Sequence, residues 1–224
     1  MGGRLTGRRV VVTDSNEFMG PDIAALFREE GAEVLADARD LTVPSASGDL
    51  IRDAGRVDIL MVNLAITYSP GFVQDIEDAE LDRMLDRLVR PLHRLVRAVL
   101  PQMKERGNGK IVIVGSAAAL RGQPRRSVYA AARGAQHAYV RTVGVEVAPF
   151  GVNVNATGQN FVENPTYFPP EYQATEEFKK RMEGVPAGRL STGREAAQFL
   201  LFLAGPESDF FFGQVFPYAG GWVA

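Results

Sequence analysis

Short apolar runs alternate with segments of helical periodicity along most of the chain. Runs of β-branched and aliphatic residues without polar alternation are typical of strands that are buried on both faces. Apolar residues spaced by three and four positions are typical of amphipathic helices. The pattern predicts strands at 9–13, 32–36, 57–63, 110–116, 151–156 and 214–217, and helices at 20–30, 80–104, 129–148 and 195–204.

Three features interrupt this alternation. The stretch 41–56 is short and polar, so a further strand there would be brief. The stretch 158–180 is rich in proline, asparagine and aromatic residues, which favours an irregular loop. Pro91 lies inside the predicted helix 80–104, where its missing N–H predicts a kink or a break.

The order of strands and helices predicts an α/β fold with a Rossmann-like, doubly wound parallel sheet and helices on both faces. We expect a single domain over residues 1–224, because no repeat or linker divides the chain, and the loop at about 158–180 follows the end of a predicted strand. Ligands of such folds bind beyond the carboxyl ends of the strands. Those ends fall at Thr13, Asn63, Ser116 and Ala156.

Composition narrows the classes of function. The net charge is −2 and 46% of the residues are hydrophobic, so neither a nucleic-acid partner nor a membrane partner is indicated. The chain has no cysteine, which excludes disulfides and a thiolate nucleophile. No apolar run reaches the roughly 18 residues of a membrane helix, and we expect a cytoplasmic protein. His93 and His137 lack ligand-like neighbours in the sequence, so no metal site is predicted.

The stretch from Ser116 to Arg133 carries the candidate chemistry. Ser116 ends a predicted strand, and Tyr129 and Arg133 lie four positions apart, so they share one face of a helix. A guanidinium beside a phenol favours the phenolate, which gives a base with a nearby hydroxyl to orient a substrate. The alternative is structural: Ser116 caps a turn and the other two form a surface pair. The spacing Ser-x12-Tyr-x3-basic resembles the short-chain dehydrogenase/reductase superfamily, in which the last residue is usually lysine.

The turn after the first predicted strand departs from that superfamily. The reductases carry T-G-x-x-x-G-x-G there, whereas Thr13 to Gly20 is T-D-S-N-E-F-M-G. Glycines let the backbone approach a pyrophosphate, so Asp14, Glu17 and Phe18 all predict that no dinucleotide cofactor binds. The motif N-x-A-G after a later strand is also altered, to N-L-A-I at 63–66.

These departures, together with the retained serine and tyrosine, resemble the halohydrin dehalogenases, cofactor-free relatives of the reductases. Their motifs are T-x4-F-x-G and S-x12-Y-x3-R, and both are present, from Thr13 and from Ser116. The resemblance implies that Tyr129 removes the proton of a vicinal haloalcohol, Ser116 holds its oxygen and Arg133 favours the phenolate. The product would be an epoxide, and small anions such as azide, cyanide and nitrite would open epoxides in reverse.

The resemblance also implies a halide site in the space that a nicotinamide would fill, with the loop at about 158–180 as its substrate and halide-site loop. Aromatic ring edges and backbone N–H groups can both face an anion. For Phe161, Tyr167 and Phe168, hydrophobic packing under a long loop is an equal alternative. The expected lining residues are Phe18, Gln159, Asn160, Phe161, Val162 and Tyr167.

Two rival functions remain open. One is an NAD(P)-dependent reductase of the same superfamily, which a cofactor-binding titration would identify. The other is a non-catalytic sensor on the same fold, which an assay for halide release would separate from an enzyme. The resemblance further implies a homotetramer, with the helices 80–104 and 129–148 at its interfaces, and partners limited to haloalcohols, epoxides and small anions.

Overall fold

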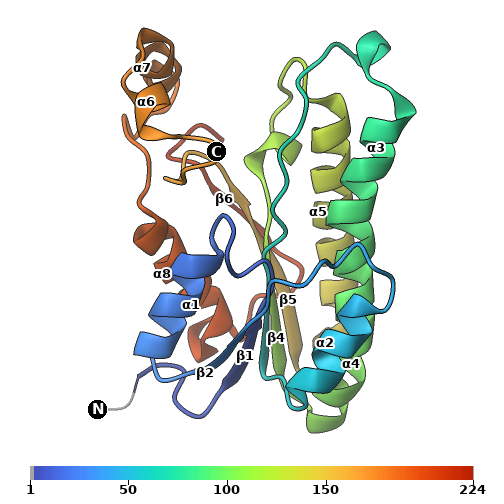
Figure 1. The fold of residues 1–224 in the computed structure, drawn as a ribbon. Coiled ribbons are helices and arrows are strands. Elements are labelled where there is room, and N and C mark those ends of the chain that lie inside the picture. The colour runs from blue at the N-terminus through green and yellow to red at the C-terminus, as the bar shows by residue number, and fades with distance from the viewer. Residues whose placement is uncertain (1–2, 224) are drawn as a thin grey trace.

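The computed structural model describes residues 3–223, which form an α/β fold around one six-stranded sheet (Figure 1). The strand order is β2-β1-β3-β4-β5-β6, and every neighbouring pair is parallel. The predicted fold class is therefore confirmed. The strands are β1 (Arg9–Val12), β2 (Glu33–Ala36), β3 (Ile59–Val62), β4 (Gly109–Val114), β5 (Val152–Gln159) and β6 (Val215–Tyr218).

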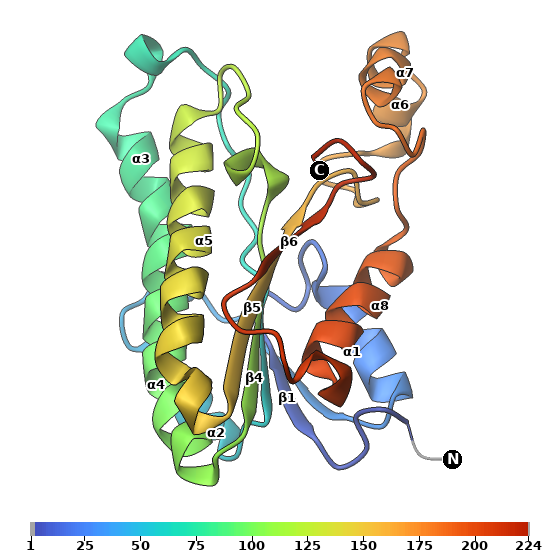
Figure 2. The same ribbon diagram turned by 180° about the vertical axis from the view of Figure 1, so that it is seen from behind.

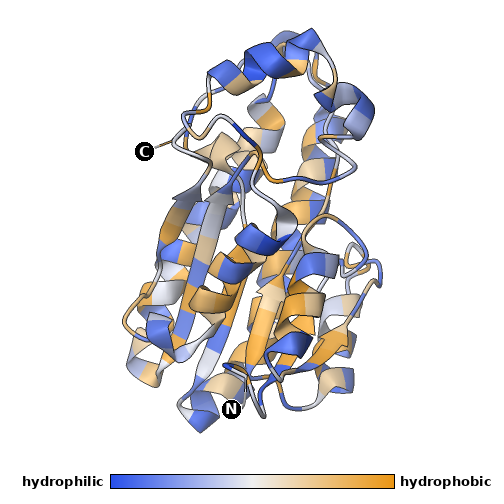
Figure 3. Ribbon diagram, turned by 90° about the vertical axis from the view of Figure 1, so that its left-hand side faces the viewer, coloured by the Kyte–Doolittle hydropathy of each residue, from blue (hydrophilic) through white to orange (hydrophobic). Residues whose placement is uncertain are grey.

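Helices cover both faces of the sheet (Figures 1 and 2). One face carries α1 (Gly20–Glu29) and α8 (Gly193–Ala204), and the other carries α2 (Ala46–Ala54), α4 (Arg90–Arg106) and α5 (Ser127–Val147). Successive side chains of a strand point to opposite faces. Val10 and Val12 accordingly belong to the core under α1 and α8, whereas Val11 belongs to the core under α2, α4 and α5. The strand segments in the centre of Figure 3 are coloured orange for this reason.

The stretch 41–56 folds as a helix, so the expectation of a brief strand there was wrong. Ala46, Leu50, Ile51 and Ala54 are buried, and their spacing puts them on one side of α2, which packs against α4. Gly55 ends the helix with a positive φ of 64°. The apolar positions are few and small, which is why the period was weak in the sequence.

The predicted helix 80–104 is interrupted as Pro91 indicated. The helix α3 (Asp78–Met84) passes through a π-helical segment, Leu85–Val89, into α4, where Pro91 occupies the first turn. Because Pro91 has no N–H to donate to the preceding turn, the wider π-helical turn absorbs the lost hydrogen bond.

The predicted loop 158–180 is more regular than expected. The strand β5 extends to Gln159, and two short helices follow, α6 (Pro170–Gln173) and α7 (Glu176–Glu183). They stand above the carboxyl edge of the sheet (Figures 1 and 2). They cover a separate apolar cluster whose buried members are Phe161, Phe168, Met182, Val185 and Leu190. None of the helices within residues 3–223 is both long and apolar enough to cross a bilayer.

Candidate active site

Ser116, Tyr129 and Arg133 come together at the carboxyl edge of the sheet. Ser116 lies just after β4, and the other two lie in the first two turns of α5. All three side chains are buried, and Arg133 is only 2% exposed. Ser116 and Tyr129 both line a cavity of about 270 Å³. The contacts described for residues 3–223 include no direct hydrogen bond between Ser116 and Tyr129, so the cavity is what unites them.

The guanidinium of Arg133 is held by four acceptors. Its Nε donates to the Tyr129 phenolic oxygen at 3.2 Å, and its Nη1 donates to the Val114 carbonyl at 3.2 Å and to Gln136 Oε1 at 3.0 Å. Its Nη2 donates to the Leu64 carbonyl at 3.0 Å. Because Tyr129 accepts here, its own hydrogen must point elsewhere. The positive charge of Arg133 thus lies directly beside the phenolic oxygen.

A backbone hydrogen bond fixes the orientation of the Ser116 hydroxyl. Its Oγ accepts from the Ala118 N–H at 3.2 Å, and the residue has an extended conformation with φ of −139°. A hydroxyl that accepts through one lone pair keeps its hydrogen free to donate. Ser116 is therefore positioned to donate a hydrogen bond to a ligand oxygen in the cavity.

The residues expected at the halide site all line this same cavity. They are Phe18, Gln159, Asn160, Phe161, Val162 and Tyr167. Phe18 and Tyr167 meet edge to face with ring centroids 5.7 Å apart, and the Tyr167 hydroxyl donates to the Ile66 carbonyl. Burial raises the pKa of Tyr167, which keeps this phenol protonated. Both alternatives hold for Phe161 and Phe168, because they line the cavity and also pack in the apolar cluster beneath α7.

The loop backbone contributes less to an anion site than expected. The Asn160 N–H donates to the Tyr218 carbonyl at 3.0 Å, and the Phe161 N–H donates to Asn160 Oδ1 at 2.9 Å. Phe161 has a positive φ of 57°, which this Asn160 contact supports. These two N–H groups are therefore already satisfied by the protein.

Gln159 offers unused hydrogen-bonding capacity instead. The residue ends β5 and is only 4% exposed, and neither its amide oxygen nor its amide nitrogen has a partner among residues 3–223. A buried amide without partners is unfavourable unless a ligand or water satisfies it. Since Gln159 lines the cavity, a ligand there can accept from its Nε2.

Three further cavity residues were not predicted. The ring of Tyr68 stacks on Tyr129 with centroids 4.8 Å apart, and the Arg126 guanidinium lies 5.1 Å from the Tyr68 ring. Arg181 of α7 also lines the cavity, with its guanidinium 5.5 Å from the centre of the Phe161 ring. Arg126 lies within the stretch Ser116 to Arg133 and could have been noticed there. Tyr68 and Arg181 had no sequence signal, because both belong to segments without periodicity or motif.

The turn after β1 is filled by its own side chains. The Asp14 carboxylate accepts from the Ala65 N–H at 2.8 Å and pairs with Arg87 at 3.1 Å, and it is only 4% exposed. Burial raises the pKa of Asp14, while the Ala65 hydrogen bond and the Arg87 charge oppose that rise. The Asn63 amide donates to the carbonyls of Asp14 and Glu17, at 3.0 and 2.8 Å.

Two backbone features lock this turn. Asp14 and Phe18 have positive φ angles of 42° and 53°, a conformation that is uncommon outside glycine. Gly20 is required by packing, because a Cβ there would lie 2.5 Å from the Asp14 carbonyl oxygen. The remaining glycine of the turn thus serves the turn itself.

His137 lies on α5 one turn beyond Arg133 and is buried. Neither of its ring nitrogens has a partner in the described part of the chain. Burial, with the nearby charges of Arg133 and Arg141, lowers its pKa to about 4, so the imidazole is neutral at pH 7. No group of three or more His, Cys, Asp or Glu side chains within residues 3–223 could hold a metal ion.

Known proteins place this geometry in a family. Residues 4–223 match the family model described as Enoyl-(Acyl carrier protein) reductase. The chain is 29% identical over 248 residues to the 3-oxoacyl-(acyl-carrier-protein) reductase FabG of Thermotoga maritima, covering 98% of this chain and 99% of that one.

Two solved structures are similar over the same length. One is described as "Dehalogenation enzyme", with a TM-score of 0.88 and 30% identity over 98% of this chain and 99% of that chain. The other is described as a short chain dehydrogenase/reductase family protein, with a TM-score of 0.87 and 29% identity over 98% and 99%. The chain therefore belongs to that reductase family and is an enzyme of the short-chain dehydrogenase/reductase superfamily.

Proposed function

We propose that this enzyme is a halohydrin dehalogenase, which converts vicinal haloalcohols into epoxides without a cofactor. One observation carries the proposal: Ser116 and Tyr129 line an open cavity and Arg133 donates to the Tyr129 oxygen, while the Asp14–Arg87 pair occupies the turn after β1. The first arrangement supplies acid–base chemistry. The second removes the groups that a dinucleotide needs.

Tyr129 acts as the base in this proposal. The guanidinium of Arg133 stabilises its phenolate, and Ser116 donates a hydrogen bond to the substrate oxygen. As the substrate proton passes to the Tyr129 oxygen, the substrate oxygen attacks the neighbouring carbon. The carbon–oxygen bond forms, the carbon–halogen bond breaks, and the halide leaves with the bonding electron pair. The proton then passes from Tyr129 to solvent.

The same groups serve the reverse reaction. Tyr129 then donates its proton to the epoxide oxygen while a small monovalent anion, such as azide, cyanide or nitrite, attacks a ring carbon. The anion occupies the site bounded by Phe18, Tyr167 and the segment from Gln159 to Val162, which shares one cavity with Tyr129. The ring edges and the Gln159 amide carry partial positive charge toward it.

A nicotinamide dinucleotide does not fit the residues after β1. Pyrophosphate needs free backbone N–H groups and close approach to the chain. Here the Asp14 carboxylate already takes the Ala65 N–H, and its negative charge would repel a phosphate. The Phe18 ring, packed edge-on against Tyr167, lies where a cofactor would need space. We therefore propose that the enzyme uses neither a cofactor nor a metal.

The alternative is an NAD(P)-dependent reductase, and one observation favours it. The curated relatives at 29% identity are described as reductases and dehydrogenases. Similarity over the whole chain does not distinguish the two functions, because they differ in the turn after β1.

Two measurements decide between these functions. Halide release from 1,3-dichloro-2-propanol should be rapid with no added cofactor, and calorimetry with NAD and NADP should give no saturable heat. Micromolar binding of either nucleotide, combined with no halide release, would establish the reductase instead.

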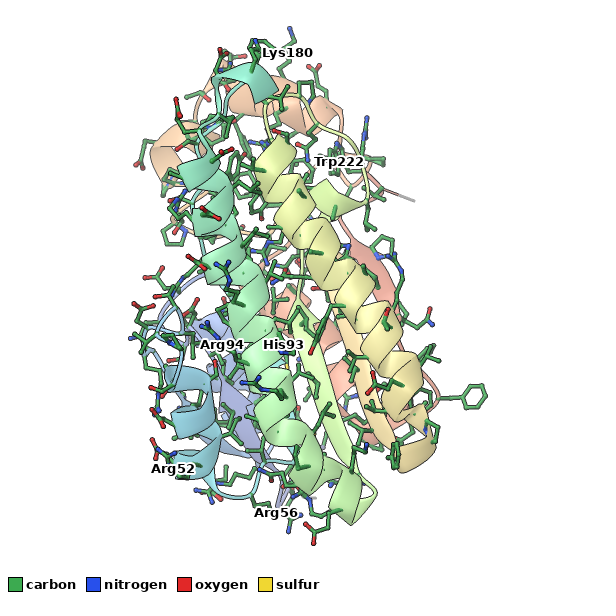
Figure 4. The ribbon with its side chains drawn as sticks, turned by 90° about the vertical axis from the view of Figure 1, so that its right-hand side faces the viewer. Arg52, Arg56, His93, Arg94, Lys180 and Trp222 are labelled. Carbon is green, nitrogen blue, oxygen red and sulfur yellow. The ribbon has the colours of Figure 1, made fainter. Side chains whose placement is uncertain are left out.

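We further propose that the enzyme is a homotetramer. The outer surfaces of α4 and α5 lie side by side, with His93 and Arg94 on the exposed side of α4 (Figure 4). Val145 of α5 is 70% exposed, and Phe150 just beyond α5 is also exposed. Apolar side chains at such positions suit burial against another copy. Light scattering of the purified protein tests this, and a monomeric mass would refute it.

A further inference from the structure

The cavity carries two arginines that the proposed reaction does not use. Arg126 precedes α5, and Arg181 belongs to α7; both line the cavity together with Tyr129. No aspartate or glutamate is among the described lining residues. The chain as a whole has 27 acidic residues against 25 basic ones, so this cluster of positive charge opposes the overall balance.

Neither arginine forms an ion pair within residues 3–223, although many arginines elsewhere do. Arg39, Arg83, Arg189 and Arg194 all pair with carboxylates on the surface. The neighbours of the two cavity arginines are aromatic instead. The Arg126 guanidinium lies 5.1 Å from the Tyr68 ring, and that of Arg181 lies 5.5 and 5.4 Å from the rings of Phe161 and Phe168. A guanidinium stacked on rings is held in place while its N–H groups can face an anion. One N–H of Arg181 also donates to the Tyr172 hydroxyl at 3.4 Å, and its other N–H groups have no partner among residues 3–223.

Both charges converge near the reacting group. The positive charges of Arg126 and Arg181 both oppose the rise that burial causes in the pKa of Tyr68. The Tyr68 ring is stacked on Tyr129 at 4.8 Å. An anionic group held by these arginines would therefore share one cavity with the alcohol that Tyr129 deprotonates.

We infer that the preferred substrate is a haloalcohol, or the matching epoxide, that carries a carboxylate, and that Arg126 and Arg181 bind this carboxylate. The inference rests on the proposed function of the same cavity. The planar guanidinium fork matches the two oxygens of a carboxylate and gives no comparable advantage to a spherical halide. The released halide belongs beside Phe18 and Tyr167, so the two anionic groups occupy separate walls.

A matched pair of substrates tests the inference. Halide release from 4-chloro-3-hydroxybutanoate should exceed that from its methyl ester by about tenfold in kcat/KM at low ionic strength, since the pair differs in one charge near two cations. Raising the salt concentration should shrink this ratio, because exposed charges are screened. Equal kcat/KM values for the acid and the ester, or a higher value for the ester, would overturn the inference while leaving the proposed dehalogenation intact.

Arginine variants locate the effect. Arg126→Ala and Arg181→Ala should each lower the acid-to-ester ratio by about threefold, because each removes one of the two cations that together give the tenfold preference. Arg125→Ala and Lys180→Ala are the matched controls. Arg125 lies over the Phe72 ring and Lys180 is an exposed residue of α7 next to Arg181, and neither lines the cavity (Figure 4). A ratio that falls equally in the controls would place the carboxylate elsewhere and overturn the assignment.

Equilibrium binding separates this inference from the proposed function. Calorimetry with 3-hydroxybutanoate and its methyl ester needs no turnover, since neither carries a halogen. Tighter binding of the acid than of the ester, lost in Arg126→Ala and Arg181→Ala, supports the carboxylate site. If that result came with no halide release from any haloalcohol, the proposed dehalogenase function would be wrong and the carboxylate site would stand. Equal binding of acid and ester overturns the carboxylate site.

Discussion

The carboxyl edge of the sheet carries two crevices with opposite chemistry. After β1 and β3, the Asp14 carboxylate pairs with Arg87 and accepts from the Ala65 N–H, and the Asn63 amide N–H groups donate to backbone carbonyls. After β4 and β5, Ser116 keeps a free hydroxyl hydrogen and Gln159 keeps an amide without partners. The frame of strands and helices is the same around both.

This contrast shows that strand ends alone do not identify a ligand site. Every parallel sheet of this kind offers crevices at its carboxyl edge. In the first crevice, the Asp14 carboxylate and the Asn63 amide N–H groups are used by the protein's own hydrogen bonds, and the cavity of about 280 Å³ beside them is lined by Arg87 and Phe18. In the second, polar groups are buried without being satisfied, and a substrate can satisfy them.

The largest expected effect is on the rate of halide release, when the base is removed from the open crevice. Tyr129→Phe removes the only group in contact with Arg133 that can take a substrate proton, so halide release should fall by about 10³-fold. The fold should be retained, because the ring and its stack on Tyr68 remain. Initial rates of halide release and a thermal melt measure the two quantities.

Tyr68→Phe is the matched control for this change. It deletes a phenolic hydroxyl from the ring that stacks on Tyr129 and leaves the ring itself in the cavity. A much smaller fall in rate is expected. If both variants lost activity equally, Tyr129 would not be the base.

The sheet and its main helices could be predicted from the sequence, for a physical reason. Strands buried on both faces need continuous apolar runs such as Val10 to Val12, and these runs leave a strong local signal. The helix α2 was missed because its buried face consists of Ala46, Leu50, Ile51 and Ala54, too few large residues to show a period. The helices α6 and α7 were missed because each spans at most eight residues among prolines and aromatics.

The site could be predicted only where one motif holds its residues together. Ser116, Tyr129 and Arg133 lie within one local stretch, and their spacing fixes their faces. Asp14 and Arg87 are far apart in the chain but form a pair in the fold. Arg181 is likewise far in sequence from Ser116 and Tyr129 but lines the same cavity. Such contacts depend on how helices cross the sheet, which no local pattern encodes.

The buried His137 beneath the open crevice should make stability depend on pH. The pKa of His137 is about 4 in the folded protein, against about 6.5 when exposed. The unfolded chain therefore binds more protons than the native one between these values, so stability is complete above pH 6.5 and falls as the pH drops toward 4. The loss from this residue should be about 3 kcal/mol.

His137→Gln tests this pH dependence, since glutamine stays neutral throughout. Urea unfolding between pH 4 and pH 7 should show a shallower slope for this variant than for the parent. His93→Gln is the matched control, because His93 is the only other histidine and lies on the outer side of α4 (Figure 4). Equal slopes for the parent and His137→Gln would contradict the assignment.

A smaller effect is expected from opening the closed crevice. Asp14→Asn keeps the shape of the side chain and tolerates the positive φ of 42°, but removes the charge that faces Arg87. Arg87 loses its buried partner and keeps only the exposed Asp40 and the Ala65 carbonyl, which should lower the free energy of unfolding by about 2 kcal/mol.

Asp40→Asn gives the comparison within the same network. Asp40 pairs with the same Arg87 at 3.4 Å, but its side chain is 62% exposed. An exposed pair contributes little, so a change below about 0.5 kcal/mol is expected by chemical denaturation. Equal losses in the two variants would mean that burial does not distinguish Asp14, and the closed crevice would need another explanation.

The smallest effect distinguishes a ligand-binding amide from a structural one. Gln159 and Gln136 are both buried glutamines near the active site, but only Gln136 is paired, with Arg133 and with the Leu88 carbonyl. Replacing each by methionine removes the amide and keeps most of the volume. Gln159→Met should raise the free energy of unfolding by about 1 kcal/mol, since it removes an unsatisfied buried group, whereas Gln136→Met should lower it.

The same Gln159→Met variant should bind anions less well, because the N–H groups of Asn160 and Phe161 are already used by the protein. Bromide inhibition of halide release should weaken by about fivefold, the size expected when one hydrogen bond of about 1 kcal/mol is lost. A more stable enzyme with weaker bromide inhibition is the signature of an amide kept for its ligand. If Gln159→Met were less stable and bromide inhibition were unchanged, Gln159 would be a packing residue, and the anion would lie elsewhere in the cavity.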